Sequence, residues 1–407
     1  MKSAKNWGRL GMKFEMKTKA LRFLSDIQTG PFGSQLHKED YVDDGTPIVT
    51  VEHLGNRVFT EQNLPRVSNE DKQRLSKYIL KEGDVVFSRV GSVDRCSFVD
   101  SQHTGWLFSG RCLRVRPFEE ISPLFLYYFF CLESTKKFIR NIAVGATMPS
   151  INTKLMGEIE VSYPDKQVQE KIANLLGAID DKIELNNAIN DNLYEMVNAY
   201  YTSLFKDVEC EMTTIGNYAE RIYSGGTPTT SNAAYWGGTF GWFSSGETRN
   251  RFVISTEKSI TQTGIDNSST KLASKHDIVM ASAGQGFTRG QTSMLLIDTY
   301  VNQSVIVIHA DRNILPYLLW NLANRYEELR AISDSSSIRG SLTTKMIAAF
   351  EIPLANNDVI QTFSDFAWAV IPQIENNLLE NERLAALRDS LLPKLMSGEL
   401  DVSAVEL

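Results

Sequence analysis

The sequence has no long uninterrupted hydrophobic run. Its longest apolar stretch covers only residues 124–130, whereas a membrane-spanning helix needs about 18 or more such residues. We therefore expect no membrane span, and the sequence shows no secretory signal pattern. With 42% apolar residues, the 407-residue chain has material for two or three domains with hydrophobic cores.

Metal-binding and disulfide patterns are also missing. The few cysteines and histidines are Cys96, Cys112, Cys131, Cys210, His37, His53, His103, His276 and His309. No two cysteines form a CxxC pair, and the histidines lack the spacing of metal ligands. The thiols are typical of a reduced, cytoplasmic protein, and we expect neither a metal nor a cofactor.

Catalytic motifs are absent as well. The sequence contains no Asn/Asp-Pro-Pro-Tyr motif of a DNA methyltransferase and no GxxxxGK[ST] phosphate loop. Residues 284–290 faintly resemble a dinucleotide-binding loop, but their third glycine stands one place late, which favours an ordinary recognition loop. We therefore expect a chain without catalytic chemistry of its own.

The chain lacks the strong positive charge that would by itself indicate a nucleic-acid-binding domain. The net charge is −7, and the two segments 23–164 and 208–350 are close to neutral. The acidity lies in residues 165–207, with four basic and eight acidic groups, and 351–407, with three and ten. Residues 1–22 carry seven basic groups against one acidic. They could be a DNA-facing arm, a helix end, or an extension before a later start at Met12 or Met16.

What the sequence does contain is a duplication. Residues 148–205 and 339–396 align without a gap at an offset of 191, so that Ser150 meets Ser341 and Lys154 meets Lys345. A period near half the chain length is too long for a solenoid repeat and indicates two copies of one module. Two copies of a module suit a target that itself has two halves.

Both copies end in a heptad-like seam. In the first copy, apolar residues and two asparagines recur alternately every four and three residues: Ile172, Leu176, Ile179, Ile183, Asn186, Asn190, Leu193, Val197, Tyr200 and Leu204. The same seam returns 191 residues later with asparagines at 377 and 381, and only Arg388 breaks it. This spacing is typical of a coiled coil, although two ordinary amphipathic helices remain an alternative. If the two helices pack antiparallel, Asn186 should lie near Asn381 and Asn190 near Asn377.

The segments before the helices have a mixed composition. Residues 47–51 and 84–88 are β-branched runs that predict strands, and residues 123–139 predict a helix with Pro123 in its first turn. Residues 207–352 repeat this plan loosely, at an offset that drifts from 195 to 193. Such drift indicates loops of different length on a common frame.

The order of these segments resembles the specificity (S) subunit of type I restriction-modification systems. The motifs that carry the resemblance are residues 30–34 (GPFGS), 83–88 (GDVVFS) and 148–180 in the first half, and 223–228 (YSGGTP) and 391–400 in the second. Residues 352–357 depart from the family pattern, because a second proline and a glutamine are missing, which leaves the start of the second helix open.

The resemblance implies an α+β fold with two mixed α/β target recognition domains. They would occupy residues 1–164, with a basic arm over 1–22, and residues 207–355. Residues 165–206 and 356–407 would form the conserved spacer helices and C-terminal tail, packed as an antiparallel coiled coil with a pseudo-two-fold repeat.

The function that the resemblance implies is the choice of a DNA sequence. Each recognition domain would read one half of a bipartite double-stranded site. The helices would set the gap between the two half sites and would dock methyltransferase subunits, of which we expect two. Restriction and translocation subunits would join that complex. The alternatives are a non-catalytic coiled-coil adaptor for two protein partners, and an enzyme whose motifs the sequence lacks.

Base reading needs hydrogen-bonding side chains on loops. The candidates are Ser34, Gln35, Arg89, Ser92, Arg95, Thr227, Thr229, Thr230, Ser231, Asn232, Arg249, Gln285, Thr288, Arg289 and Arg339. The competing interpretation is that many of these are merely solvated surface residues. The asparagines Asn186, Asn190, Asn377 and Asn381 are candidates for fixing the register of the spacer helices.

Overall fold

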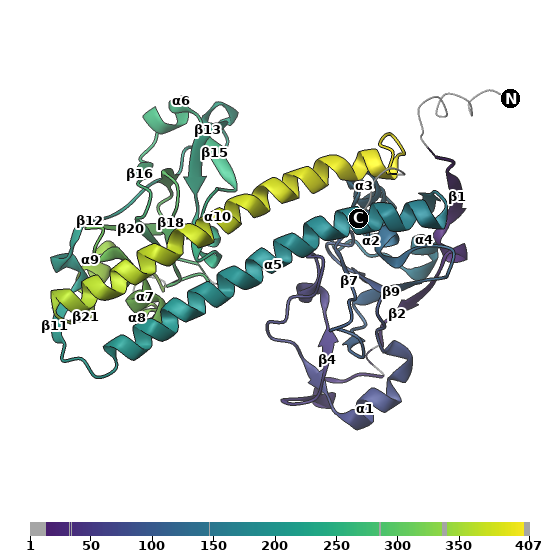
Figure 1. Cartoon of the computed structure of the whole chain (residues 1–407), viewed down its shortest axis with the longest axis horizontal. Helices are drawn as coiled ribbons and strands as arrows, with labels where there is room; N and C mark the ends of the chain where they lie inside the picture. Colours follow the sequence, from purple (N-terminus) through teal and green to yellow (C-terminus); the bar gives the residue numbers. More distant parts are fainter. Residues whose placement is uncertain are drawn as a thin grey trace. The chain divides into compact units, whose positions relative to one another are not determined.

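The structure is a computed structural model that describes residues 14–31, 33, 35–145, 147–284, 286–335 and 340–402. The chain divides into two compact units. Unit 1 is Met1–Ile183 together with Arg383–Leu407, and unit 2 is Glu184–Glu382. Each unit contains a mixed α/β body and parts of two long helices (Figure 1). None of the helices in the described ranges is long and apolar enough to cross a membrane.

The body of unit 1 is built from three small sheets. A two-stranded antiparallel sheet pairs β1 (Lys17–Ala20) with β10 (Glu160–Tyr163). A four-stranded sheet has the order β2 (Ser25–Thr29), β9 (Cys112–Pro117), β6 (Val85–Ser88), β7 (Cys96–Phe98). Another has the order β3 (Tyr41–Val42), β5 (Arg66–Val67), β4 (Thr46–Val49), β8 (Leu107–Phe108), in which β4 and β8 run parallel. The helices of this body are α1 (Asn69–Arg74), α2 (Pro123–Cys131), α3 (Glu133–Ile142) and α4 (Thr153–Gly157).

The body of unit 2 repeats this plan. The antiparallel pair is β11 (Glu211–Thr214) with β21 (Glu351–Leu354). A five-stranded sheet has the order β12 (Ala219–Ser224), β20 (Val305–Ala310), β17 (Ile278–Ala281), β18 (Thr292–Leu295), β14 (Phe252–Val253). The third sheet has the order β15 (Lys258–Ile260), β13 (Trp236–Phe243), β19 (Thr299–Val301), β16 (Lys271–Ala273), with β13 and β19 parallel. The helices are α6 (Gln262–Asp266), α7 (Leu315–Asn324), α8 (Tyr326–Ser335) and α9 (Thr344–Ala348).

The GDVVFS motif and its counterpart in unit 2 build the same turn. Asp84 accepts a hydrogen bond from the backbone N–H of Lys81 at 2.8 Å and receives two from Arg116 on the neighbouring strand, both at 2.6 Å. In unit 2, Asp277 caps the turn in the same way, and His309 lies 2.5 Å from it. Both aspartates are almost fully buried, so each needs its hydrogen-bond partners to offset the loss of water.

The predicted helix over residues 123–139 is two helices instead of one. Leu132 separates α2 from α3, with ψ of 131°, which no α-helix accommodates. The helix α2 buries most of its side chains in the main core of unit 1, whereas the charged helix α3 buries only two. The sequence pattern showed one apolar run followed by one amphipathic run, and we expected them to be continuous.

The two long helices are α5 (Lys166–Phe205) and α10 (Asn357–Met396). Asp165 accepts from the N–H of Val168 at 3.1 Å and begins α5, and Asn356 accepts from the N–H of Val359 at 3.0 Å and begins α10. The two capping residues are 191 positions apart, so the missing proline and glutamine did not shift the start of the second helix. Gly398, at φ +75°, follows the end of α10, where a left-handed residue often terminates a helix.

The helices share a core in each unit. In unit 1, Ile172 and Leu176 of α5 belong to the same buried cluster as Leu392 and Leu395 of α10. In unit 2, a cluster joins Val197 of α5 to residues of α10 that include Phe363, Ala367, Val370, Ile371 and Ile374. The early part of one helix therefore packs with the late part of the other in each unit, as an antiparallel arrangement requires.

The asparagine pairs lie within unit 2 and have the predicted partners. The side-chain amide of Asn186 donates to Asn381 at 2.9 Å, and that of Asn377 donates to Asn190 at 2.8 Å. Asn186 is fully buried, so a polar partner across the interface is necessary for it. These contacts match the expected register of the two helices.

Arg388, which breaks the seam, has a partner within unit 1. Its guanidinium donates to the buried Asp180 of α5 at 2.6 Å, and the hydroxyl of Tyr128 in α2 donates to the other carboxylate oxygen at 2.6 Å. Burial lowers the pKa of Arg388, but the hydrogen bond and charge of Asp180 outweigh it and raise this pKa above its ordinary value. The equivalent positions in unit 2 are Val197 and Ile371, which are both buried and apolar.

Candidate nucleic-acid interface

The glycines of the GPFGS and YSGGTP motifs place a loop against the end of a strand. The N–H of Gly30 donates to the carbonyl of Cys112 at 3.1 Å, and that of Gly225 donates to the carbonyl of Asn302 at 3.2 Å. A Cβ atom on Gly30 would lie 2.1 Å from a carbonyl oxygen of Ser109, and one on Gly225 would lie 1.9 Å from that of Val301. Only glycine allows so close an approach, so both motifs fix the path of a surface loop.

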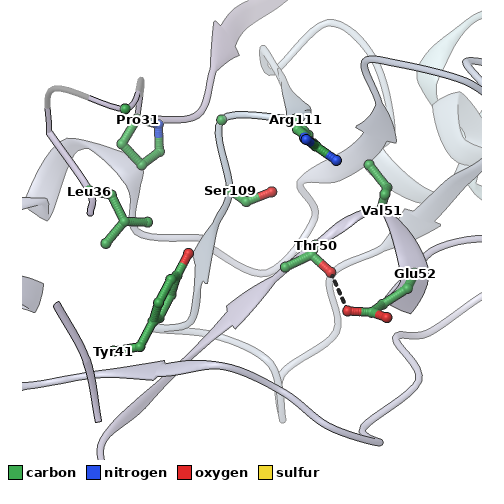
Figure 2. Close-up of a pocket in the computed structure, with 10 residues that line it drawn as sticks. Pro31, Leu36, Tyr41, Thr50, Val51, Glu52, Ser109 and Arg111 are labelled. Carbon is green, nitrogen blue, oxygen red and sulfur yellow. Dashed lines mark hydrogen bonds between the residues drawn. The ribbon is translucent and has the colours of Figure 1, made fainter. Parts of the chain in front are cut away.

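In unit 1 this loop forms one wall of a cleft of about 620 Å³. Figure 2 shows the aromatic ring of Tyr41, the guanidinium of Arg111 and the side chains of Thr50 and Glu52 around the hollow. Pro31 and Leu36 supply its apolar part. The Thr50 hydroxyl donates to Glu52 at 3.1 Å. Burial, followed by the charge of Asp40, raises the pKa of Tyr41, so its hydroxyl stays protonated at neutral pH.

Three of the predicted residues follow strand β6, and two of them make structural contacts. Arg89 donates to the carbonyl of Gly110 at 3.0 Å, and Arg95 donates to the carbonyl of Leu54. Both arginines thereby tie the segment after β6 to its neighbours. Ser92 is exposed beside Gly91, which has φ +74° and open space around it.

The other predicted residues of unit 1 lie in the GPFGS loop. The side-chain oxygen of Gln35 accepts from the Tyr78 hydroxyl at 2.6 Å, so it already has one strong partner. Ser34 lies outside the described residues.

In unit 2, two tryptophans of strand β13 hold the equivalent loop. The indole N–H of Trp242 donates to the carbonyl of Gly226, and that of Trp236 donates to the carbonyl of Thr229, both at 3.3 Å. Thr227 donates to Gln303, and Asn232 accepts from the N–H of Ala234 at the start of a 3-10 helix. The side chains at the tip of the loop are exposed: Thr229, Thr230, Ser231 and Asn232.

The predicted arginines of unit 2 are engaged with carboxylates. Arg249 is exposed and forms a salt bridge with Glu257. Arg289 is only 7% exposed, donates to the carbonyl of Gly340 at 2.6 Å and forms a salt bridge with Asp334. Arg289 is therefore buried and paired within the unit, and a contact between Arg289 and a base stays a prediction from the sequence. Thr288 beside it is half-buried, and Gln285 and Arg339 lie outside the described residues.

A metal centre is not indicated in the described ranges, where no group of three or more histidine, cysteine or acidic side chains is arranged so that it could hold a metal ion. The loops instead present hydroxyls, amides and a few cations on rigid scaffolds. Such side chains match the donor and acceptor patterns of nucleic-acid bases and phosphates.

A family model described as "Type I restriction modification DNA specificity domain" matches the chain twice, over residues 15–195 and 208–380.

The chain belongs to this family.

Members of the family include curated relatives that match nearly the whole chain. The type I restriction enzyme HindI specificity subunit of Haemophilus influenzae is 22% identical, over 82% of this chain and 90% of that protein. The type I restriction enzyme MjaIX specificity subunit of Methanocaldococcus jannaschii is 21% identical, over 94% of this chain and 93% of that protein. Among solved structures, the type I restriction-modification S subunit from M. genitalium has the same fold, with a TM-score of 0.58 at 16% identity. The match covers 95% of this chain and 97% of that chain.

Sequence reasoning missed several residues of this specificity protein that the fold brings to the loops. Arg111, Tyr41 and Glu52 line the unit 1 cleft. In unit 2, Lys258 lies over the Trp236 ring at 5.8 Å, and Lys271 lies over Tyr223 at 5.6 Å. Tyr41, Lys258 and Lys271 come from strands of the third sheet of each unit, and the pairing of those strands had no signal in the sequence.

Proposed function

We propose that this chain selects the DNA sequence on which a type I restriction-modification complex acts. The observation that carries the proposal is the double match to the DNA specificity family, which coincides with two α/β bodies whose main sheets share a run of four strands, β2-β9-β6-β7 and β12-β20-β17-β18. A pair of rigid bodies with polar loop tips is suited to read base edges in double-stranded DNA. The near-neutral charge of both bodies favours sequence reading over strong non-specific binding.

In this proposal the two bodies read different halves of one bipartite site. The recognition domains are residues 1–164 and 207–355. The candidate contacts in the described ranges are the exposed tips at Ser92 and at residues 229–232, with Gln35, Arg89, Arg95, Thr227, Arg249 and Thr288 beside them. Ser34, Gln285 and Arg339 stay proposals from the sequence alone. Different loop lengths on a common frame would let each body recognise its own bases.

The helices α5 and α10 are proposed to form an antiparallel coiled coil that sets the gap between the half sites. The shared cores and the asparagine pairs Asn186–Asn381 and Asn190–Asn377 support this role. Buried amide pairs in an apolar seam weaken packing but penalise any slip of register, which is what a spacer of fixed length needs. The two conserved halves would relate by a pseudo-two-fold axis.

The proposed partners are methyltransferase subunits, two of them, together with restriction and translocase subunits. The acidic spacer helices favour protein partners, because phosphate groups would repel them. Chemistry would belong to those partners, so this chain is proposed to be non-catalytic, to need no cofactor and to act in the cytoplasm.

The experiment that tests this function is methylome sequencing of the host with the gene present and deleted. The expected result is a split, asymmetric methylated motif that disappears on deletion and returns on complementation. A methylome that is identical with and without the gene would reject the proposal and would favour an adaptor between two protein partners.

A further inference from the structure

The walls of the cleft in unit 1 have structural counterparts in unit 2. In unit 1, Thr50 begins the 3-10 helix Val51–His53 directly after β4, and in unit 2 Ser244 begins the 3-10 helix Ser245–Arg249 directly after β13. The opposite wall is residues 109–111 in unit 1 and 302–304 in unit 2, which precede the equivalent strands β9 and β20.

The backbone of this opposite wall is fixed alike in both units. The N–H of Arg89 donates to the carbonyl of Arg111 at 2.8 Å, and the N–H of Ser282 donates to the carbonyl of Ser304 at 2.9 Å. Arg111 therefore corresponds to Ser304, and by the same comparison Glu52 corresponds to Gly246.

The two walls nevertheless carry different chemistry. Unit 1 has a cation and an anion at positions where unit 2 has a small hydroxyl and no side chain at all. Arg111 and Glu52 both line one cleft of unit 1 (Figure 2). The charged side chains of that cleft thus have no match at the same two places of unit 2.

Arg111 and Glu52 do not neutralise each other. Arg111 is exposed, and within the described parts of the chain its side chain makes no hydrogen bond or salt bridge. The side chain of Glu52 is 69% exposed, and the Thr50 hydroxyl orients its carboxylate. The Arg89 guanidinium donates a hydrogen bond to the Gly110 carbonyl and thereby fixes the backbone next to Arg111. The Arg111 cation therefore extends from a fixed backbone.

A ligand for this cleft must present acceptors and a donor together. A phosphate would satisfy Arg111 but would meet repulsion from Glu52 within the same cleft. The edge of a G·C base pair offers both kinds of group, since guanine O6 and N7 accept and cytosine N4 donates. Arginine on guanine and glutamate on cytosine are the pairings that this geometry of donors and acceptors favours.

We infer that Arg111 and Glu52 read a G·C base pair in the half site bound by unit 1. Arg111 donates to guanine O6 and N7, and Glu52 accepts from cytosine N4 of the same or the adjacent pair. Ser304 and Gly246 cannot make these contacts in unit 2, so the half site bound by unit 2 is read by other residues. The inference rests on the proposed function and adds the class of base that one site recognises.

The test uses the full chain at its native locus, with its own partner subunits. Methylomes are compared for wild type, Arg111→Ala, Arg111→Lys, Glu52→Gln and the matched control Ser304→Ala. We expect the wild-type motif to contain a G·C pair in one half, and Arg111→Ala to relax the motif at that position alone. Arg111→Lys relaxes it too, because an ammonium lacks the planar fork, and Glu52→Gln relaxes it at the same or the next pair. Ser304→Ala leaves that position unchanged.

Binding of the purified complex to duplexes with single base-pair changes gives the magnitude. Loss of the bidentate contact should lower discrimination at one position by about 5- to 150-fold, with the other positions unaffected. If Arg111→Ala abolishes methylation in the cell, this binding assay still tests the inference, because it measures base discrimination without methylation.

Three results would overturn the inference: an unchanged motif in Arg111→Ala, an equal loss of affinity on every duplex, or wild-type half sites without a G·C pair. An equal loss on every duplex would assign Arg111 to a phosphate instead. Failure of the proposed function gives a different result, because no motif would then depend on the gene in the first place.

Discussion

The buried pair between Asp180 and Arg388 makes a sharp prediction about what holds unit 1 together. The Asp180 side chain is 7% exposed and that of Arg388 is 29% exposed, so the carboxylate depends on its partner more than the guanidinium does. Among the described residues, replacing Arg388 by valine leaves the Asp180 carboxylate with only the Tyr128 hydroxyl as a hydrogen-bond partner. Breaking a buried pair in this way costs about 3–5 kcal/mol of unfolding free energy, and we expect the lower end because Arg388 is partly solvated.

The reverse single change should be milder. In Asp180→Ile the arginine can turn toward water, so a loss of about 1–2 kcal/mol is expected. The matched variant combines Asp180→Ile, Arg388→Val and Tyr128→Phe, which copies the apolar pair of unit 2 and removes the stranded hydroxyl. Its free energy of unfolding should lie within about 1 kcal/mol of wild type, because well-packed apolar residues commonly replace a buried ion pair without loss.

Thermal and urea unfolding followed by circular dichroism measure these differences. For a body of about 200 residues, a loss of 3 kcal/mol lowers the transition temperature by about 6–12 °C. Two results would refute this account of the buried pair. In the first, Arg388→Val is as stable as Asp180→Ile or more stable; in the second, the triple variant is as unstable as Arg388→Val.

The remaining predictions concern the asparagine layers, a loop glycine and a buried thiol. Asn377→Ala leaves the Asn190 carbonyl oxygen without its donor and should cost about 1–3 kcal/mol, whereas replacing both by leucine should be neutral or stabilising in urea unfolding. Gly225→Ala forces the loop off a backbone carbonyl and should cost about 1–3 kcal/mol and weaken specific DNA binding. Gly286→Ala, which has nothing within 4 Å, should stay within about 0.5 kcal/mol, and equal effects would contradict the argument. Burial raises the pKa of Cys112 from 9.0 to about 11, against hydrogen bonds that lower it. The pKa of the Cys112 thiol is thus higher in the folded chain than in the unfolded chain. The free energy of unfolding that the thiol contributes is fully present below pH 9 and is lost as the pH rises through 11, by about 2 kcal/mol at that pH. Cys112→Ala should lack this loss, and identical pH profiles would refute it.

The helical half of the fold could be predicted from the sequence because its signals are local and repeated. The seam spacing and the two asparagine layers determined which residues meet, and the contacts of Asn186 with Asn381 and of Asn190 with Asn377 followed. Arg388 was only a break in the pattern, since its partners lie on α5 and α2 and no spacing rule links them.

The candidate interface was predicted less completely. Glycine-rich motifs located the loops correctly, because a glycine at a close backbone approach has no substitute. Whether an arginine is paired within the protein, however, depends on residues that are distant in the sequence. Arg289 forms a salt bridge with Asp334, which is 45 residues away in the sequence. Arg111 went unnoticed because its importance depends on the pairing of β4 with β8, which brings residues 50–52 opposite residues 109–111.

The most direct measurement of the central claim is the host methylome with the gene present, deleted and restored. If this chain chooses the sequence for a type I restriction-modification complex, one split motif is methylated only when the gene is present. The gap of that motif stays constant in every variant that leaves α5 and α10 intact. Persistence of all methylated motifs after deletion would contradict the claim.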